Sequence, residues 1–274
     1  MKLGIGDSAF PADWPIEKVF RLAKEIGFDG IELWMRKDGY VNVHSTKEDM
    51  LKIRECADRC GIQLYSLASG IYWSVPLSSD DPEVRATAKS YVSKQLELAQ
   101  YLGCDTILVV PGAVGVDFMP HYDVVDYDVV YERAVEWVDE LKAEAEERKV
   151  YIGIENVWNK FLLSPFEMRE FVDRAKSEYV GAYFDVGNVL LTGYPEQWVK
   201  LLGSRIKQIH LKDYSRADGF VDLLKGDVNY PVVMKALRQV PYDGWLTAEY
   251  GFPREECETR VRQTFEAMQK IVAM

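Results

Sequence analysis

Short apolar runs alternate with longer amphipathic stretches along the whole chain. Each run is rich in branched and aromatic residues, and the stretch that follows it repeats its apolar positions at helical spacing. Runs of this length between polar segments are typical of buried β-strands. The pattern predicts eight strands, at residues 3–6, 30–34, 62–67, 106–110, 151–155, 181–185, 206–211 and 245–249.

Several of the intervening stretches begin with helix-capping sequences. A capping box is expected at residues 45–48, and an N-cap followed by proline is expected at residues 81–82 and 164–165. The longest amphipathic stretch predicts a helix at 127–148, and a last helix is expected at 255–272. Strands and helices are thus predicted to alternate from end to end.

Eight strand–helix units within 274 residues favour an α/β chain that folds as a single-domain (β/α)8 TIM barrel over residues 1–274. A doubly wound open sheet is the main alternative. That fold usually carries a glycine-rich first turn, and residues 4–9, Gly-Ile-Gly-Asp-Ser-Ala, lack its third glycine. The polar and aromatic connection at residues 111–127 is long enough to cover the mouth of a barrel.

Charge limits the classes of partner. The chain has 33 Lys and Arg against 44 Asp and Glu, which gives a formal net charge of −11. Such a balance argues against a broad surface for polyanions, so nucleic acid is not expected as a partner.

Cysteine usage and hydropathy indicate the compartment. Cys56, Cys60, Cys104 and Cys257 form no CxxC pair, so free thiols in a reducing compartment are expected. The first residues turn polar too early for a signal peptide, and no apolar run is long enough to span a membrane. These features predict a soluble cytoplasmic protein with no membrane partner.

Each of the last four predicted strands ends with an ionisable side chain. Side chains alternate between the two faces of a strand, and the apolar positions belong on the helix-facing side. This parity directs Glu155, Asp185, His210 and Glu249 toward the barrel axis, at the end where barrel active sites lie.

Three carboxylates at one mouth would repel one another unless a cation neutralised them. Three oxygen donors with one imidazole suit a divalent ion, with Mn²⁺, Mg²⁺ or Co²⁺ favoured and Zn²⁺ also compatible. The alternative interpretation is that the four residues are unrelated and cap helices or pair with Lys and Arg.

The local sequences around these four residues resemble the xylose-isomerase-like barrel superfamily, and within it the sugar and sugar-phosphate isomerase/epimerase branch. The resemblance covers nearly the whole chain. It is carried by an ordered set of motifs: Gly30-Ile31-Glu32-Leu33, Gly153-Ile154-Glu155-Asn156, Phe184-Asp185-Val186-Gly187-Asn188, His210-Leu211-Lys212-Asp213, Gly226-Asp227-Val228-Asn229 and Ala248-Glu249.

The resemblance implies one divalent metal ion held by Glu155, Asp185, His210 and Glu249. It also implies a ketose 3-epimerase or an aldose–ketose isomerase that acts on a sugar or sugar phosphate. Glu155 and Glu249 would be its acid/base pair, and the metal would stabilise a cis-enediolate. Proton transfer beside a carbonyl needs a base, and inversion needs an acid on the opposite face, which agrees with two such glutamates. Relatives suggest a homodimer or homotetramer.

The same resemblance suggests substrate-binding residues. Related epimerases place a substrate-contacting His where this chain has Asn188, so the resemblance does not specify the exact substrate. Arg216 matches the spacing of a substrate-binding Arg, and Lys212 follows His210 inward, so both can bind hydroxyls or phosphate. A solvated loop charge is the alternative interpretation for Arg216.

Other residues near strand ends have two interpretations each. Glu32 is directed inward, where it fits a polar floor of the barrel as well as catalysis. Trp34, Tyr72, Trp73 and Trp158 can stack on a sugar ring or pack in the core.

Three other functions compete with the isomerase hypothesis. A metal-dependent dehydratase of a keto-inositol or keto-sugar would use similar ligands. An apurinic-site endonuclease shares the fold but needs several more His ligands than the three His of this chain provide. A barrel that binds metal or sugar without turnover is the third, and the two glutamates argue against it.

Overall fold

The computed structural model describes residues 1–119 and 121–274. In this part of the chain, eight parallel strands close into a barrel, because β1 pairs with β11 on one side and with β2 on the other. The barrel strands are β1 (Lys2–Gly6), β2 (Gly30–Arg36), β4 (Gln63–Ser69), β5 (Thr106–Val109), β6 (Tyr151–Glu155), β7 (Val180–Asp185), β8 (Ile206–Leu211) and β11 (Trp245–Ala248).

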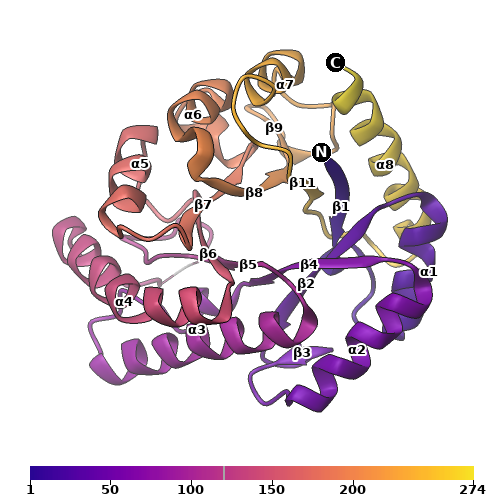
Figure 1. Cartoon of the computed structure of the whole chain (residues 1–274). Coiled ribbons are helices and arrows are strands. Elements are labelled where there is room, and N and C mark those ends of the chain that lie inside the picture. Colours follow the sequence, from indigo (N-terminus) through magenta and orange to yellow (C-terminus); the bar gives the residue numbers. More distant parts are fainter. Residues whose placement is uncertain (120) are drawn as a thin grey trace.

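A ring of helices surrounds the barrel, and Figure 1 shows this ring from one end. The helices are α1 (Ile16–Ile26), α2 (Lys47–Cys60), α3 (Pro82–Leu102), α4 (Tyr127–Arg148), α5 (Pro165–Arg174), α6 (Pro195–Leu202), α7 (Tyr230–Leu237) and α8 (Cys257–Ala273). The TIM-barrel prediction is confirmed, and the open-sheet alternative is excluded because β1 and β2 close the sheet.

The predicted helix starts agree with the structure except at α2 and at α8, which begins at Cys257, two residues later than predicted. The caps expected before α3 and α5 are present, at Asp81 and Ser164. At α2 the capping box begins one residue later than predicted, because the N-cap is Thr46 and its partner is Asp49. Ser45 instead accepts a hydrogen bond from the Asn42 amide at 2.9 Å, so its side chain stabilises the preceding turn.

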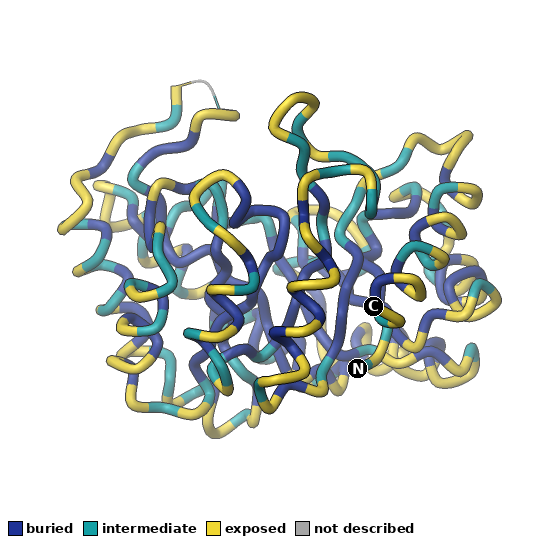
Figure 2. Tube along the Cα trace, turned by 90° about the horizontal axis from the view of Figure 1, so that it is seen from above, coloured by how far each residue is buried: buried dark blue, intermediate teal, exposed yellow. Residues whose placement is uncertain are grey.

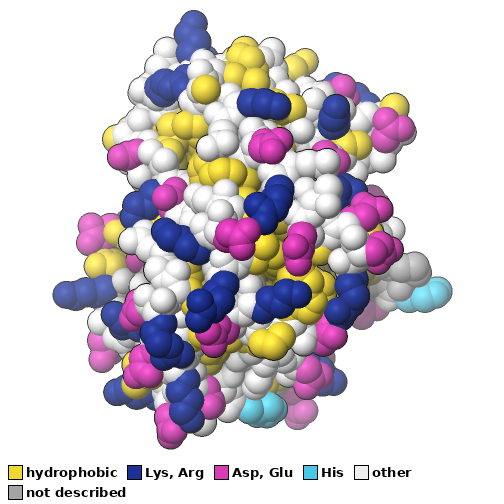
Figure 3. Space-filling model, turned by 90° about the vertical axis from the view of Figure 1, so that its right-hand side faces the viewer, with side chains coloured by type: hydrophobic (Ala, Val, Ile, Leu, Met, Phe, Trp, Pro, Cys, Tyr) yellow, Lys and Arg dark blue, Asp and Glu magenta, His cyan; other side chains and the backbone are white. Residues whose placement is uncertain are grey.

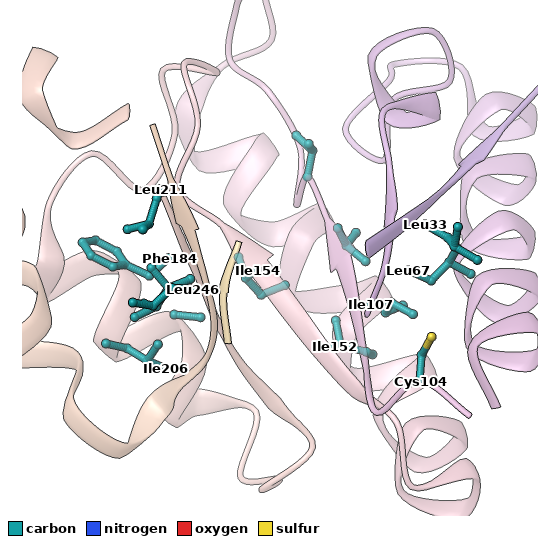
Figure 4. Packing of buried hydrophobic residues seen from close by; sticks show 14 of the residues in the cluster. Leu33, Leu67, Cys104, Ile107, Ile152, Ile154, Phe184, Ile206, Leu211 and Leu246 are labelled. Atoms are coloured by element: carbon teal, nitrogen blue, oxygen red, sulfur yellow. The ribbon is translucent and has the colours of Figure 1, made fainter. Parts of the chain in front are cut away.

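The apolar side of each strand packs against the helices, as the parity argument predicted. Figure 4 shows part of this layer, with outward side chains such as Ile152, Phe184 and Leu246, which all belong to one large buried cluster. The barrel interior contains a separate, much smaller apolar cluster of Ala68 and Leu108 with Tyr183. Most of the remaining interior positions are polar, so the strands are apolar outside and mixed inside.

Large aromatic rings fill the barrel interior where a nearby strand has glycine. A Cβ atom on Gly4 would lie 2.0 Å from Tyr65 Oη, and one on Gly153 would lie 2.8 Å from the Tyr183 ring. The Tyr65 hydroxyl is 2.7 Å from Thr247 Oγ1 across the barrel. The glycines therefore let these rings fill the barrel and extend polar groups across it.

Short elements extend the rim at the carboxyl ends of the strands. β3 (Val41–Asn42) pairs with the end of β2, and β9 (Asp213–Ser215) forms a hairpin with β10 (Gly219–Val221). The predicted long connection after β5 also lies here, and Figure 2 shows it extending beyond the barrel on either side of the grey residue. The predicted barrel mouth is thus surrounded by long loops.

Charges of both signs are interspersed on the surface, as Figure 3 shows for the face that carries α1 and α8. Arg262 of α8 pairs there with Glu25 of α1 at 2.7 Å. None of the helices in residues 1–119 and 121–274 is long and apolar enough to cross a membrane.

Candidate active site

Four ionisable side chains from consecutive barrel strands converge at the mouth. Glu155 ends β6, Asp185 ends β7, His210 lies in β8, and Glu249 follows β11. Each offers a ligand atom, and these atoms all lie within 4.8 Å of one another. Asp185 and His210 are direct neighbours in the strand pairing, which explains how residues far apart in sequence meet. These four residues are called the four-residue cluster below.

The polar atoms of the cluster fit a divalent cation. His210 Nδ1 lies 2.7 Å from Glu249 Oε2 and 3.9 Å from Asp185 Oδ2. All three atoms are buried, and none makes a well-formed hydrogen bond. Buried polar atoms are almost always paired, so three without a hydrogen bond at one point indicate a ligand. Carboxylate oxygens with one imidazole nitrogen form a donor set that suits a divalent metal.

Burial and mutual repulsion perturb the carboxylates of the cluster. Desolvation raises the pKa of Glu155 to about 8, and the nearby Glu249 carboxylate adds to the rise. Desolvation also raises the pKa of Asp185. For Glu249 the same burial would raise the pKa, but the charges of Lys212 and His210 outweigh it and lower the pKa. A cation among these oxygens would relieve the repulsion.

Lys212 extends its ammonium group into the cluster. Its Nζ lies 2.7 Å from Glu249 Oε2 and 3.2 Å from Asp185 Oδ2. Burial would lower the pKa of Lys212, but Asp185 and Glu249 raise it well above its ordinary value, so the side chain is a cation. With all three carboxylates ionised, one lysine would leave an excess of negative charge that a bound cation would offset.

Asparagine side chains hold the ends of β6 and β7 together. The Asn156 side chain accepts a hydrogen bond from the Asp185 amide and donates one to the Asp185 carbonyl, both at 2.8 Å. The backbone N–H of Asn188 donates a hydrogen bond to Asp185 Oδ1 at 2.7 Å, which leaves Asp185 Oδ2 directed at the cluster. The motifs around Glu155 and Asp185 therefore direct one Asp185 oxygen at the cluster.

Asp213 organises the loop that follows β8. This buried carboxylate accepts backbone hydrogen bonds from Tyr214, Gly226 and Val228. A Cβ atom on Gly226 would lie 2.3 Å from Asp213 Oδ1, so glycine is required there. The two motifs after His210 thus form one structural unit that supports Lys212.

Two connected cavities open beside the cluster and share four lining residues, Trp34, Lys212, Phe220 and Glu249. The first, here called the aromatic cavity, has a volume of about 400 Å³. It is also lined by Ser69, Gly70, Trp73, Leu108, Val110, Phe118, Glu155, Val157, Trp158 and Asn188.

The second, here called the outer cavity, has a volume of about 700 Å³ and extends toward the loops after β8 and β11. Its further lining residues are Ser8, Val221, Asp222, Lys225, Tyr250, Gly251, Phe252 and Arg260. Together the cavities give a small molecule direct access to the cluster.

The structure brings two of the three predicted substrate-binding residues to the cavities. Lys212 and Asn188 line the aromatic cavity, although the Asn188 side chain also donates a hydrogen bond to the Asn156 carbonyl at 3.0 Å. Arg216 is exposed near the tip of the β9–β10 hairpin and lines neither cavity. This exposed position fits the alternative interpretation, in which Arg216 is a solvated loop charge.

The structure also separates the four aromatic residues that were expected either to stack on a sugar ring or to pack in the core. Trp34, Trp73 and Trp158 line the aromatic cavity. Tyr72 is buried and donates a hydrogen bond to Gln95 Oε1 at 2.5 Å, so it packs in the core. Phe118 and Phe220 line the cavity too. The sequence pattern had not singled them out, because Phe118 lies in an irregular loop and Phe220 in the short rim strand β10.

Comparison with known proteins identifies the family. The model of the xylose isomerase-like TIM barrel family matches residues 20–271 of the chain, and the chain belongs to this family. Among curated proteins it is similar to SgbU of Escherichia coli strain K12, which is provisionally named an L-ribulose-5-phosphate 3-epimerase. The two are 27% identical over 277 residues, which cover 90% of this chain and 88% of SgbU.

Solved structures show the same fold. The structure of D-psicose 3-epimerase with D-tagatose from Clostridium cellulolyticum H10 has a TM-score of 0.81 at 18% identity, over 99% of both chains. The IolI protein with a binding zinc atom has a TM-score of 0.80 at 17% identity, over 100% of this chain and 98% of that one. The resemblance that the sequence motifs carried is thereby confirmed.

Proposed function

We propose that this chain is a divalent-metal-dependent isomerase of a ketose or ketose phosphate, with 3-epimerisation as its reaction. The observation that carries the proposal is the four-residue cluster, in which two glutamates flank one point beside a cavity lined with aromatic rings. Aromatic faces pack well against the C–H faces of sugars, and the carboxylates supply groups for proton transfer.

Glu155, Asp185, His210 and Glu249 would hold the metal, because their buried donor atoms converge on one point. When bound, a divalent ion supplies polarisation of a carbonyl oxygen and of its neighbouring hydroxyl. Mn²⁺, Mg²⁺ and Co²⁺ suit the oxygen-rich donor set, and the zinc atom bound by the IolI protein supports Zn²⁺ as well.

Glu155 and Glu249 are the proposed acid/base pair. Each belongs to the cluster and also lines the aromatic cavity, so each carboxylate can reach a substrate carbon there. One glutamate removes the proton beside the carbonyl, and the other returns a proton to the opposite face of the resulting enediolate.

Lys212 and Asn188 would orient the substrate. The Lys212 ammonium is buried beside the proposed acid/base pair, where it can donate hydrogen bonds to substrate hydroxyls or to a phosphate. The names of SgbU and of the C. cellulolyticum protein support ketoses and ketose phosphates as the substrate class. Substrate contact by Arg216, assembly into a dimer or tetramer, and a cytoplasmic location stay predictions.

Deuterium exchange tests the proposal. The metal-loaded protein is incubated in D₂O with a panel of ketoses and ketose phosphates, and products are followed by NMR. Deuterium at C3 together with an epimer would support the proposal and identify the substrate. Exchange at C1 would favour aldose–ketose isomerisation, and loss of water would favour the dehydratase. No exchange with any sugar, with metal bound, would contradict the proposal.

A further inference from the structure

A fourth carboxylate, Glu32 of β2, lies inside the barrel below the cluster. Its side chain is fully buried, and it is not a member of the four-residue cluster. Glu32 Oε1 lies 2.8 Å from His210 Nε2, and Glu32 Oε2 accepts a hydrogen bond from the Tyr183 hydroxyl. Ser66 Oγ lies 3.0 Å from the same hydroxyl. A continuous hydrogen-bonded chain therefore runs from β4 through β7 and β2 to His210.

The charge of Glu32 requires a partner, because a buried carboxylate is costly without one. Among the described residues, His210 is the basic side chain that forms an ion-pair contact with it. Arg36, at the end of the same strand, pairs with Asp7 at 2.5 Å instead. The position of Glu32 is thus explained by His210 and not by a general need for polar groups in the barrel floor.

The contact also determines which nitrogen of His210 faces the cluster. With Nε2 directed at Glu32, Nδ1 is directed at Asp185 and Glu249. A metal ligand must present a lone pair, so Nδ1 is unprotonated in that role and Nε2 carries the hydrogen. The Nε2 hydrogen is then donated to Glu32. Tyr183 further restricts the ring, because it packs edge-on at 4.7 Å between ring centroids.

We infer that Glu32 is a positioning residue for the metal site: it fixes the ring orientation and the tautomer of His210, so that Nδ1 is available as a ligand. Tyr183 in turn holds the Glu32 carboxylate. This inference rests on the metal site of the proposed function, but it does not depend on which substrate is turned over. Carboxylate partners of ligand histidines make the imidazole a stronger donor, so loss of Glu32 lowers metal affinity.

Metal binding by the full chain measures this role directly. Apo protein is mixed with Mn²⁺, and free Mn²⁺ is followed by EPR to obtain a Kd for wild type, Glu32→Gln and Glu32→Ala. Loss of such a partner typically weakens metal binding by about 10–100-fold, and that is the expected range for Glu32→Ala. Glu32→Gln keeps an acceptor for His210 but loses the charge, so a smaller loss is expected.

Leu33→Ala is the matched control. Leu33 is the next residue of β2, equally buried, but it packs in the apolar layer. This variant should lower the melting temperature and leave the Mn²⁺ affinity within about twofold, since a cavity in the core touches no ligand. Tyr183→Phe should weaken Mn²⁺ binding less than Glu32→Ala, because it removes only one hydrogen bond of the carboxylate.

NMR of the Zn²⁺-loaded protein with ¹⁵N-labelled histidine gives a second readout. A downfield Nε2–H signal from His210 is expected in wild type, and its loss or shift is expected in Glu32→Gln. Wild-type Mn²⁺ affinity and an unchanged His210 signal in Glu32→Gln would overturn the inference.

These measurements also distinguish a failure of the positioning role of Glu32 from a failure of the proposed function. Weaker metal binding in Glu32→Gln, with no sugar turned over by wild type, would overturn the function and support the positioning role. A wild-type protein that binds no metal at the cluster would overturn both.

Discussion

The two halves of the barrel differ in how the buried carboxylates at their strand ends are paired with basic side chains. In the first half, Asp7 follows β1 and pairs with Arg36 at the end of β2, so one buried carboxylate meets one guanidinium. In the second half, Glu155, Asp185 and Glu249 share one lysine. The first arrangement pairs charges one to one, whereas the second places three carboxylates around one lysine. The difference fits a structural role for the first pair and the cation site that we propose for the second group.

The halves also differ in what they contribute to the cavity. Trp34, Trp73 and Phe118 come from the loops and strand ends of the first half and form much of the aromatic cavity. The charged groups come from the second half. Trp158 and Phe220 of the second half complete the aromatic lining. Both halves thus shape the cavity, whereas the four-residue cluster comes entirely from the second half.

The largest expected effect lies in the charged half. Glu155→Gln and Glu249→Gln should each lower kcat by about 10²–10⁴-fold, the usual contribution of one acid or base. Rates are measured by NMR on the ketose that exchanges fastest. Asp7→Asn is the control from the other half, and it should retain turnover although it removes a buried carboxylate. Near-normal rates in either glutamine variant would contradict the acid/base assignment.

Metal content is the next test of the comparison. Asp185→Asn should reduce the bound metal well below one ion per chain at a metal concentration that saturates wild type, because a carboxylate donor is lost. Elemental analysis after gel filtration measures the stoichiometry. An unchanged stoichiometry would remove Asp185 from the ligand set, and Asp7→Asn should again bind metal normally.

The balanced pair of the first half should affect stability instead. Arg36→Met leaves Asp7 buried without its partner and should lower the free energy of unfolding by about 2 kcal/mol, somewhat less than for a fully buried pair. Chemical denaturation measures the change. Arg21→Met breaks an exposed pair with Glu17 on α1 and should leave the free energy of unfolding nearly unchanged, because solvent screens this pair. Equal losses in the two variants would mean that burial adds nothing to the Asp7–Arg36 pair.

The smallest effect is expected for the aromatic lining. Trp158→Ala should raise KM by about 2–10-fold with little change in kcat, since stacking contributes on the order of 1 kcal/mol. Tyr72→Phe is the matched control, because Tyr72 packs in the core and lines neither cavity. A large fall in kcat for Trp158→Ala, with KM unchanged, would show that the aromatic lining and the four-residue cluster do not divide binding and chemistry in this way.

Sequence periodicity predicted the barrel and the side chains that face its axis, because both depend on local alternation along single strands. It placed Glu155, Asp185, His210 and Glu249 on the inner face, and the structure brings them together. Parity also directed Glu32 inward, but its contact with His210 joins side chains 178 residues apart. This contact depends on closure of the barrel and on the rotamers of Glu32 and His210, and a local sequence pattern specifies neither.

Loop residues are harder to predict for a related reason. The spacing after His210 predicts that Arg216 contacts the substrate, and the structure places Arg216 at an exposed position near the tip of the β9–β10 hairpin. Its contact with substrate stays a prediction. Phe220, on the returning strand of the same hairpin, lines both cavities instead. Spacing along a loop does not specify direction, because the loop's path is determined by backbone contacts such as those made by Asp213.

Closure of the barrel by β1 has a consequence during synthesis on the ribosome. β1 emerges first, yet one of its edges pairs with β11, whose first residue Trp245 lies opposite Lys2. Glu249 follows that strand, so a nascent chain lacks both the closing strand and one proposed ligand until residue 249 has been synthesised. Pairing of such distant segments is slow and exposes unpaired edges meanwhile. A chain that stops before residue 249 therefore cannot assemble the complete four-residue cluster, and the metal binding that we propose there can only follow synthesis of the whole barrel.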